Sequence, residues 1–350
     1  MTATAASRPR RTRGVALRGA VALVVGVLAG CVTDPTPVPP VSSSTIPAPT
    51  TSSSSLPVGA SEHAVTIDGR IRMYRAYRPP DVLEPVPLVV MLHGGLGNAR
   101  AAEAAYGWDV LAQTQGFIVL YPDAVANAWN AGGGCCGLAP GQGVDDVGFV
   151  KRAIDEVRQS APIDPKRIYV TGMSNGGMMA YRMACESDLF AAIGPVAATL
   201  LGDCTNPAPT SVIHIHGTDD TTIPYAGGVD TGVAHVDGPA VPALIARWRT
   251  TDRCGGEVIS TAGLVTRSLA RCPSGRDVLL VTVEGGGHAW PGVARSGPLD
   301  SHPSATTTPA PAPTPTPTPD GAAPSPHASQ SGDALNATWE IWAFFKAHAR

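Results

Sequence analysis

The chain has 350 residues, of which 43% are hydrophobic and 15% charged, and its formal net charge is -3. The length is sufficient for one large α/β domain with a well-buried core, since domains of this class often exceed about 200 residues. A net charge near zero, without a block of basic residues, argues against nucleic acid as a partner.

Residues 1–31 are predicted to be a lipoprotein signal peptide. A basic segment with five arginines precedes the apolar run 21–28, which is too short to span a bilayer. The run ends in Leu-Ala-Gly-Cys, which resembles a bacterial lipobox with Cys31 as the lipidated residue. An ordinary signal peptide with a chance cysteine, or a short anchor, is the alternative. A tether-like stretch directly after Cys31 favours the lipoprotein interpretation. We therefore expect an extracytoplasmic protein that is lipid-anchored to the cell membrane or secreted.

Two segments, 32–60 and 296–331, are rich in Pro, Ser and Thr. Such segments bury too little apolar surface to offset the entropy cost of ordering them. We interpret the first as a linker to the membrane and the second as a solvated insertion. The single folded domain is predicted to span residues 61–350, with the insertion inside it.

The elements predicted along the folded domain alternate between strands and helices. Stretches 64–67 and 71–77 alternate as a solvated antiparallel strand pair does. Continuous apolar runs, typical of strands buried on both faces, lie at 87–92, 117–121, 167–171, 211–215 and 278–283.

Helical spacing of apolar residues predicts a helix between Val147 and Val157, and a second helix is expected over 178–185. A final helix is expected after Asn336. Its inner face is predicted to carry Leu335, Trp339, Trp342 and Phe345. Strands interleaved with helices predict a mostly parallel, doubly wound sheet with right-handed crossovers.

Ser174 is the predicted nucleophile of an α/β-hydrolase fold. The segment 172–176 reads Gly-Met-Ser-Asn-Gly, which matches G-x-S-x-G, and it directly follows the predicted strand 167–171. This turn is too tight for side chains two residues before or after the serine, so both positions are glycine and the serine rises off the sheet.

His288 is the predicted catalytic base. In this fold the acid and then the histidine follow the serine along the chain. His288 follows strand 278–283 through three glycines, a flexible turn off a sheet edge. The other histidines beyond a possible acid are less well placed, in a loop, in the insertion or near the chain end: His235, His302, His327 and His348.

The orienting acid and the oxyanion hole are expected on two further turns. Asp219 and Asp220 both follow strand 211–215, and spacing alone does not separate them. The backbone N–H of Asn175 is the first predicted oxyanion donor. Gly95, in the turn after strand 87–92, is the second.

Six cysteines remain besides Cys31, and an even number in an exported protein predicts disulfides. Cys254 and Cys272 flank a short strand-like stretch and are the predicted pair. The other four allow three pairings, including a bridge between neighbours: Cys135, Cys136, Cys185 and Cys204. Zinc binding is the alternative, but the spacings do not resemble a known zinc site, so no metal is expected.

Six motifs in chain order resemble those of secreted polyhydroxybutyrate depolymerase-like esterases, a group similar to feruloyl and acetylxylan esterases. They are LHGG (92–95), WNAGGGCCG (129–137), VDDVGFV (144–150), GMSNGG (172–177), HGTDDTTIPY (216–225) and EGGGHAWPG (284–292). The resemblance covers about 61–292 and the closing helix. It implies Ser174, His288 and Gly95 in the roles given above. It also places the acid on Asp220 and implies that Trp290 lines the acyl pocket.

The chain departs from the family pattern at Gly95-Leu96, where some polymer depolymerases have a cysteine-containing turn, and at the insertion. We recognise no carbohydrate- or polyester-binding module. The expected reaction is ester hydrolysis through an acyl-enzyme, without a metal or organic cofactor. Expected substrates are feruloyl, acetyl-sugar or short hydroxyalkanoate esters. The alternatives are an envelope acyltransferase that uses the same triad and a catalytically silent binding lipoprotein.

Overall fold

The computed structural model describes residues 55–229, 236–293 and 335–350. Several predictions lie outside these residues: the signal peptide, the lipidation of Cys31, most of the linker, the insertion 296–331, and His235, His302 and His327. The predicted domain start at residue 61 is slightly late. The first strand already begins at Gly59, and Leu56 is buried with its N–H bonded to the Ser160 carbonyl at 2.8 Å.

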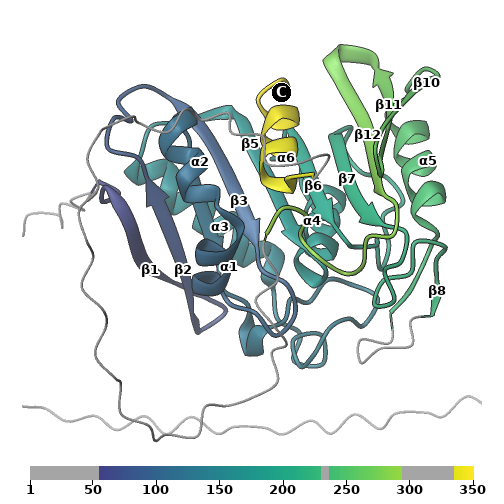
Figure 1. The fold of residues 1–350 in the computed structure, drawn as a ribbon. Helices are drawn as coiled ribbons and strands as arrows, with labels where there is room; N and C mark the ends of the chain where they lie inside the picture. The colour runs from purple at the N-terminus through teal and green to yellow at the C-terminus, as the bar shows by residue number, and fades with distance from the viewer. Residues whose placement is uncertain (1–54, 230–235, 294–334) are drawn as a thin grey trace, which may run out of the picture. The chain divides into compact units, whose positions relative to one another are not determined.

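A ten-stranded sheet forms the centre of the described domain, in the order β1-β2-β4-β3-β5-β6-β7-β12-β11-β10 (Figure 1). The six strands from β4 to β12 are parallel to one another, whereas β1 and β2 on one side and β11 and β10 on the other pair antiparallel. The predicted α/β class with a mostly parallel sheet is therefore confirmed. The strands are β1 Gly59–Ile67, β2 Arg70–Arg78, β3 Val86–Leu92, β4 Ile118–Pro122, β5 Ile163–Met173, β6 Ala192–Val196, β7 Ser211–Gly217, β10 Glu257–Ala262, β11 Val265–Cys272 and β12 Arg276–Val283. A separate short pair consists of β8 Gly228–Val229 and β9 Asp237–Gly238.

Helices cover both faces of the sheet, which explains the continuous apolar runs. In β3, Leu88 and Val90 belong to one core cluster, whereas Val89 belongs to the other. Successive residues of a strand point to opposite faces, so a strand buried on both must be apolar throughout. One face packs against α3 Asp146–Ser160, α4 Asn175–Glu186 and α5 Val241–Thr251, and the other against α1 Ala99–Tyr106, α2 Trp108–Gln115 and α6 Ala337–Phe345 (Figure 1).

The predicted inner face of the last helix is wrong at one position. α6 begins after Asn336, as expected, and buries Trp342 and Phe345, but Trp339 is 53% exposed. Ile341 lies at the centre of the buried face. Since each helical residue advances by about 100°, Trp339 lies almost opposite Ile341 and faces solvent.

Three disulfides are present in the described domain. The predicted Cys254–Cys272 bridge is confirmed, with Cα atoms 3.9 Å apart, and it encloses the whole β10–β11 hairpin rather than one short strand. Of the open pairings, the neighbours Cys135 and Cys136 are bridged to each other. The remaining bridge, Cys185–Cys204, joins the end of α4 to the segment after β6.

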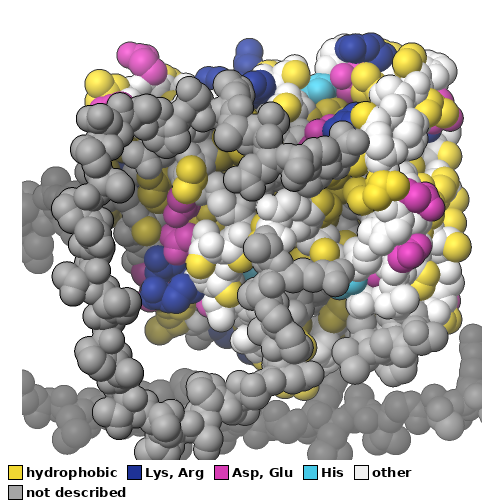
Figure 2. All heavy atoms as spheres, viewed as in Figure 1, with side chains coloured by type: hydrophobic (Ala, Val, Ile, Leu, Met, Phe, Trp, Pro, Cys, Tyr) yellow, Lys and Arg dark blue, Asp and Glu magenta, His cyan; other side chains and the backbone are white. Residues whose placement is uncertain are grey.

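Figure 2 shows Lys and Arg side chains beside Asp and Glu at several places on the visible face. Charges of both signs are thus interspersed there rather than gathered into one block. None of the described helices is both long and apolar enough to cross a membrane.

Candidate active site

The site lies where the strand order of the sheet reverses. From β3 the chain passes to β4 on one side and then to β5 on the other, and such a switch point opens a crevice at the carboxyl ends of the strands. Gly94 and Gly95 leave β3 there, and Ser174 leaves β5. A Cβ atom on Gly94 would lie 3.8 Å from the Ser174 Cβ, and one on Gly95 would lie 3.7 Å from the Asn175 Cβ. The fold therefore brings together the predicted serine and both predicted oxyanion donors.

Ser174 stands on a sharp turn between β5 and α4. Its φ of 55° and ψ of -122° are unusual for a residue with a side chain, and such geometry costs on the order of 1–3 kcal/mol. The turn is held by the Ser174 N–H, which donates to the Val196 carbonyl at 2.9 Å. A Cβ on Gly172 would overlap the backbone of Gly176, and one on Gly176 would overlap the carbonyl of Leu92. Both glycines are therefore required by close backbone contact, as the sequence motif predicts.

Asp220 and His288 form a hydrogen bond of 2.9 Å between the carboxylate Oδ2 and the ring Nδ1. The Asp220 side chain is fully buried, whereas that of His288 is 21% exposed. Two backbone N–H groups, from Thr222 and Ile223, donate to the Asp220 Oδ1 at 2.9 and 2.8 Å. Asp219, in contrast, is exposed, and its N–H donates to Gly286. Of the two aspartates, only Asp220 therefore contacts His288.

Charge at Asp220 is stabilised by these contacts. Burial alone would raise its pKa, but hydrogen bonds from His216 and His288 and the charge of His288 hold the pKa of Asp220 below its ordinary value of 3.8. The carboxylate is therefore ionised at neutral pH and available to an imidazolium.

The turn carrying His288 is fixed against the turn carrying Asp220. A Cβ on Gly217, at the end of β7, would overlap the backbone of Gly286, so the two segments approach through glycine. The Gly285 N–H also donates to the Thr218 hydroxyl at 2.8 Å. β12 lies inside the sheet, between β7 and β11, so His288 leaves the carboxyl end of an inner strand rather than an outermost one.

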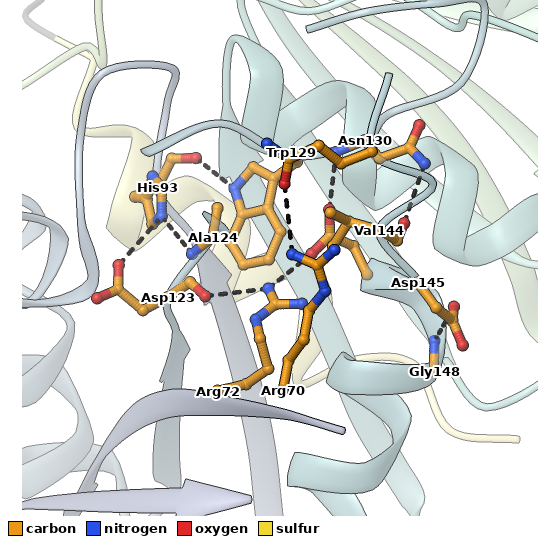
Figure 3. A network of polar contacts seen from close by, with 12 residues as sticks. Arg70, Arg72, His93, Asp123, Ala124, Trp129, Asn130, Val144, Asp145 and Gly148 are labelled. Carbon is orange, nitrogen blue, oxygen red and sulfur yellow. Dashed lines mark hydrogen bonds and ion pairs between the residues drawn. The ribbon is translucent and has the colours of Figure 1, made fainter. Parts of the chain in front are cut away.

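Trp129, for which no role was predicted, connects the two segments that carry the predicted oxyanion donors. Its indole N–H donates to the His93 carbonyl at 2.8 Å, beside Gly94. Its backbone N–H donates to the Asn175 Oδ1 at 2.6 Å, and its carbonyl accepts from the Asn175 Nδ2 at 3.1 Å. Figure 3 shows the indole of Trp129 pointing toward His93. Both polar atoms of the Asn175 side chain are thereby bonded to the backbone of Trp129.

A buried ion pair lies next to the segment that carries Trp129, and Figure 3 shows its arginine, Arg72, near Trp129 and Asn130. Arg72 and Asp146, 3% and 0% exposed, are paired at 2.6 Å. The second oxygen of Asp146 accepts from the N–H of Asn130, the residue after Trp129, at 2.8 Å. The guanidinium also lies 3.9 Å from the centre of the Phe149 ring. The pair therefore connects β2 and α3 to the segment that carries Trp129.

Replacing Asp146 by Ala is expected to lower the free energy of unfolding by about 3–5 kcal/mol, because it leaves the buried charge of Arg72 unpaired. Urea unfolding followed by circular dichroism measures the change. The matched control is Asp145→Ala, which removes only an exposed helix cap to Gly148 and is expected to cost about 1 kcal/mol. Equal losses in the two variants would contradict the importance of the buried pair.

Trp290 is almost fully buried on the α1–α6 side of the sheet. Its indole N–H donates to the Thr338 hydroxyl at 3.0 Å, and its ring lies 4.6 Å from that of Tyr106. The Tyr106 hydroxyl in turn contacts the sulfur of Met173, next to Ser174, at 3.7 Å. Trp290 is thus linked to the serine turn through Tyr106, and its expected role in an acyl pocket stays a prediction. Within the described residues, no group of three or more His, Cys, Asp or Glu side chains is arranged to hold a metal ion.

The inner parallel strands, the glycine turn after β5 and the later Asp and His turns define an α/β-hydrolase of the esterase type. Residues 72–265 match the family model described as "Esterase PHB depolymerase". The chain belongs to this family and is a carboxylic ester hydrolase. The resemblance stated from the six motifs is confirmed.

Relatives of known name agree with this assignment. The chain is 31% identical over 316 residues to "Putative esterase NocK" of Nocardia uniformis subsp. tsuyamanensis, covering 80% of this chain and 91% of the relative. It is 32% identical over 220 residues to feruloyl esterase B of Piromyces equi, covering 58% of this chain but only 39% of that protein. Among solved structures, an acetyl xylan esterase from Aspergillus awamori is 15% identical, with 65% of this chain and 94% of that chain covered and a TM-score of 0.49.

Proposed function

We propose that the chain hydrolyses carboxylic esters through an acyl-enzyme formed on Ser174. The Ser174 oxygen attacks the ester carbonyl while the Nε2 of His288 accepts its proton, and the alcohol leaves with that proton. A water molecule, activated by the same histidine, then releases the acid and restores the serine. Asp220 holds the imidazole through Nδ1 and stabilises the imidazolium that forms.

The single observation that carries this proposal is the 2.9 Å hydrogen bond between Asp220 and His288 at the same end of the sheet as the Ser174 turn. An ionised, buried carboxylate on Nδ1 leaves Nε2 of the neutral ring without a proton, which is the form a general base requires. Each of the three groups leaves the carboxyl end of a different parallel strand, so the sheet fixes their order along its edge.

The backbone N–H groups of Asn175 and Gly95 are proposed to bind the oxyanion. No hydrogen-bond partner is found for either N–H within the described part of the chain. Each donor of this kind contributes about 3–4 kcal/mol to transition-state stabilisation in a well-measured case. Trp129 would keep the two donors at a fixed separation, since it is bonded to both segments.

Feruloyl, acetyl-sugar and short hydroxyalkanoate esters are the proposed substrates. Relatives named feruloyl esterase, acetylxylan esterase and poly(3-hydroxyalkanoate) depolymerase support this range. A cavity of about 750 Å³, lined on one side by residues 133–137 and on another by Leu200 and Leu201, has the size of a small-molecule site. The loop that carries 133–137 is connected to Asn175 through Trp129, but none of Ser174, Asp220 and His288 lines this cavity.

An ester panel tests the substrate class. The full chain is assayed with p-nitrophenyl acetate and butyrate, methyl ferulate, acetylated xylan and 3-hydroxybutyrate oligomers, with and without an alcohol acceptor. We expect a clear preference in kcat/KM for the ferulate, acetylxylan or hydroxybutyrate substrate. Hydrolysis of the p-nitrophenyl esters alone would contradict the substrate proposal. Alcohol esters as the main product would instead identify an acyltransferase.

We also propose that the enzyme acts outside the cytoplasm, attached to the membrane through Cys31. Three disulfides support an oxidising compartment. Mass spectrometry of the mature N-terminus checks the anchor. Acyl chains on Cys31 are the expected result, and an unmodified, uncleaved N-terminus would contradict it.

A further inference from the structure

A row of buried polar side chains leads away from Asp220 along the inside of β7. The Nε2 of His216 lies 3.3 Å from the Asp220 Oδ2. The Nδ1 of the same ring lies 2.9 Å from the Nε2 of His214, two residues earlier on the same face of the strand. The Nδ1 of His214 lies 2.8 Å from the hydroxyl of Tyr181 on α4. Both histidines and the tyrosine are at most 1% exposed.

The hydrogen positions in this row follow from its end at Ile223. The carbonyl of Ile223 lies 2.8 Å from the His216 Nε2 and can only accept, so Nε2 carries hydrogen. With the rings neutral, the Nδ1 of His216 accepts from His214, and the Nδ1 of His214 accepts from the Tyr181 hydroxyl. Every donor then points toward Asp220, and every buried polar atom of the row has a partner.

Two histidines therefore contact the same carboxylate oxygen. His288 lies 2.9 Å and His216 3.3 Å from the Asp220 Oδ2. Either ring would be stabilised by that carboxylate if it became protonated. Hydrolysis through an acyl-enzyme requires the proton on His288, because only its ring is partly exposed at the crevice. A proton on His216 would neutralise the charge that His288 needs.

We propose that Tyr181 and His214 are positioning residues that keep His216 neutral. The negative charge of Asp220 then stabilises the imidazolium of His288 and not a cation on His216. This inference rests on the proposed function, since it assumes that Asp220 and His288 act together in the reaction.

Tyr181 and His214 oppose a proton on the Nδ1 of His216 because every hydrogen bond of the row is donated in the direction of Asp220. A proton on the Nδ1 of His216 would need an acceptor in His214, which would have to move its own hydrogen to the side of Tyr181. The tyrosine hydroxyl would then accept instead of donate, and its own hydrogen would lose its partner in a fully buried place, which is unfavourable. Burial, and to a smaller extent the neighbouring His216, also lowers the pKa of His214 well below 6.5, so His214 does not become charged instead.

Other titratable groups close to His216 are few in the described residues. The ring of Tyr225 contacts it edge-on with ring centres 5.9 Å apart, and the Tyr225 hydroxyl is bonded to Thr282. Asp220 follows on the same strand end, and His288 reaches that carboxylate from the turn after β12. The protonation state of His216 therefore depends on two opposing contacts. Asp220 favours the cation, whereas His214 and Tyr181 oppose it.

Nitrogen-15 NMR of histidine-labelled full-length protein tests the proposal without any substitution. We expect the His216 ring to keep the shifts of a neutral Nε2–H form from pH 5 to 8. Signals are identified by their loss in His216→Gln and His288→Gln. A cationic His216 at neutral pH would overturn the proposal.

The kinetic test replaces His214 by Gln, whose amide presents an oxygen to the His216 Nδ1 as readily as an N–H. His216 then gains a proton, the imidazolium of His288 loses stabilisation, and the acid limb of the kcat/KM profile moves to lower pH. We expect a decrease in kcat of about tenfold at pH 7, which corresponds to one pKa unit, with KM little changed. Val212→Ala, on the same face of β7, is the matched control that loosens packing and leaves the acid limb in place.

An acid limb that stays in place in His214→Gln would overturn the inference, provided that Asp220→Asn is strongly impaired. If Asp220→Asn and His288→Gln both retain full activity, the proposed function itself fails. The two failures are thus distinguished by the same set of variants.

Discussion

Replacing Ser174 by Ala is expected to lower kcat for ester hydrolysis by about 10⁶-fold, the loss seen when a serine nucleophile is removed from an intact triad. No other group at the turn replaces the lost oxygen, because residues 172 and 176 are glycines and the Asn175 side chain is bonded to Trp129. The variant is expected to fold normally, since Ala occupies the same backbone position without a larger side chain. Steady-state hydrolysis of p-nitrophenyl butyrate measures the loss, and circular dichroism confirms the fold.

The matched control is Ser187→Ala, at the other end of α4, where the hydroxyl donates only to the Met183 carbonyl at 2.7 Å. It is expected to keep the wild-type rate. An organophosphate should add one covalent group to the wild-type chain and to Ser187→Ala, and none to Ser174→Ala. Labelling of the Ser174→Ala variant, or turnover within tenfold of wild type, would place the nucleophile elsewhere.

The parts of the fold that the sequence predicts are those whose pattern is local. Strands buried on both faces must be apolar throughout, so β3, β4 and β12 can be predicted from continuous runs of apolar residues. β6 is not predicted from the sequence, because its sequence, AIGPV, is short and contains Gly194 and Pro195, which are unusual inside a central strand. The helices α1 and α2 are not predicted either, because small alanines and a break at Gly107 weaken the helical periodicity of their apolar residues.

The same division holds for the site. Ser174 can be predicted because Gly172 and Gly176 are required by close backbone contact, and His288 because three glycines precede it, of which Gly286 packs closely against Gly217. Trp129 and the buried pair of Arg72 and Asp146 do not stand out, because their partners are distant in sequence and only the fold brings them together. Asp219 and Asp220 differ by one position, and only the backbone N–H groups of the following turn decide which carboxylate points inward.

These N–H groups also determine what an amide would do in place of the Asp220 carboxylate. Because Thr222 and Ile223 both donate to Oδ1, the oxygen of an asparagine would stay on them, and its NH₂ group would face His288. The amide would then donate to the Nδ1 of His288 and leave a hydrogen on Nε2, toward the serine. In that tautomer the ring cannot accept the serine proton.

Asp220→Asn is therefore expected to lower kcat by about 10⁴-fold, the size of effect found where a triad aspartate is replaced by its amide. KM should change little, since the carboxylate is fully buried away from the substrate. Asp219→Asn is the matched control: its side chain is exposed and does not contact His288, so activity should stay within about twofold of wild type. The pH profile adds a second test, because the weakened base of Asp220→Asn should regain part of its rate as hydroxide rises above pH 9. Loss in Asp219→Asn alone would identify Asp219 as the orienting acid, and the hydrogen-bonded row behind Asp220 would then have no part in the reaction. Equal loss in the two variants would contradict a specific role for Asp220.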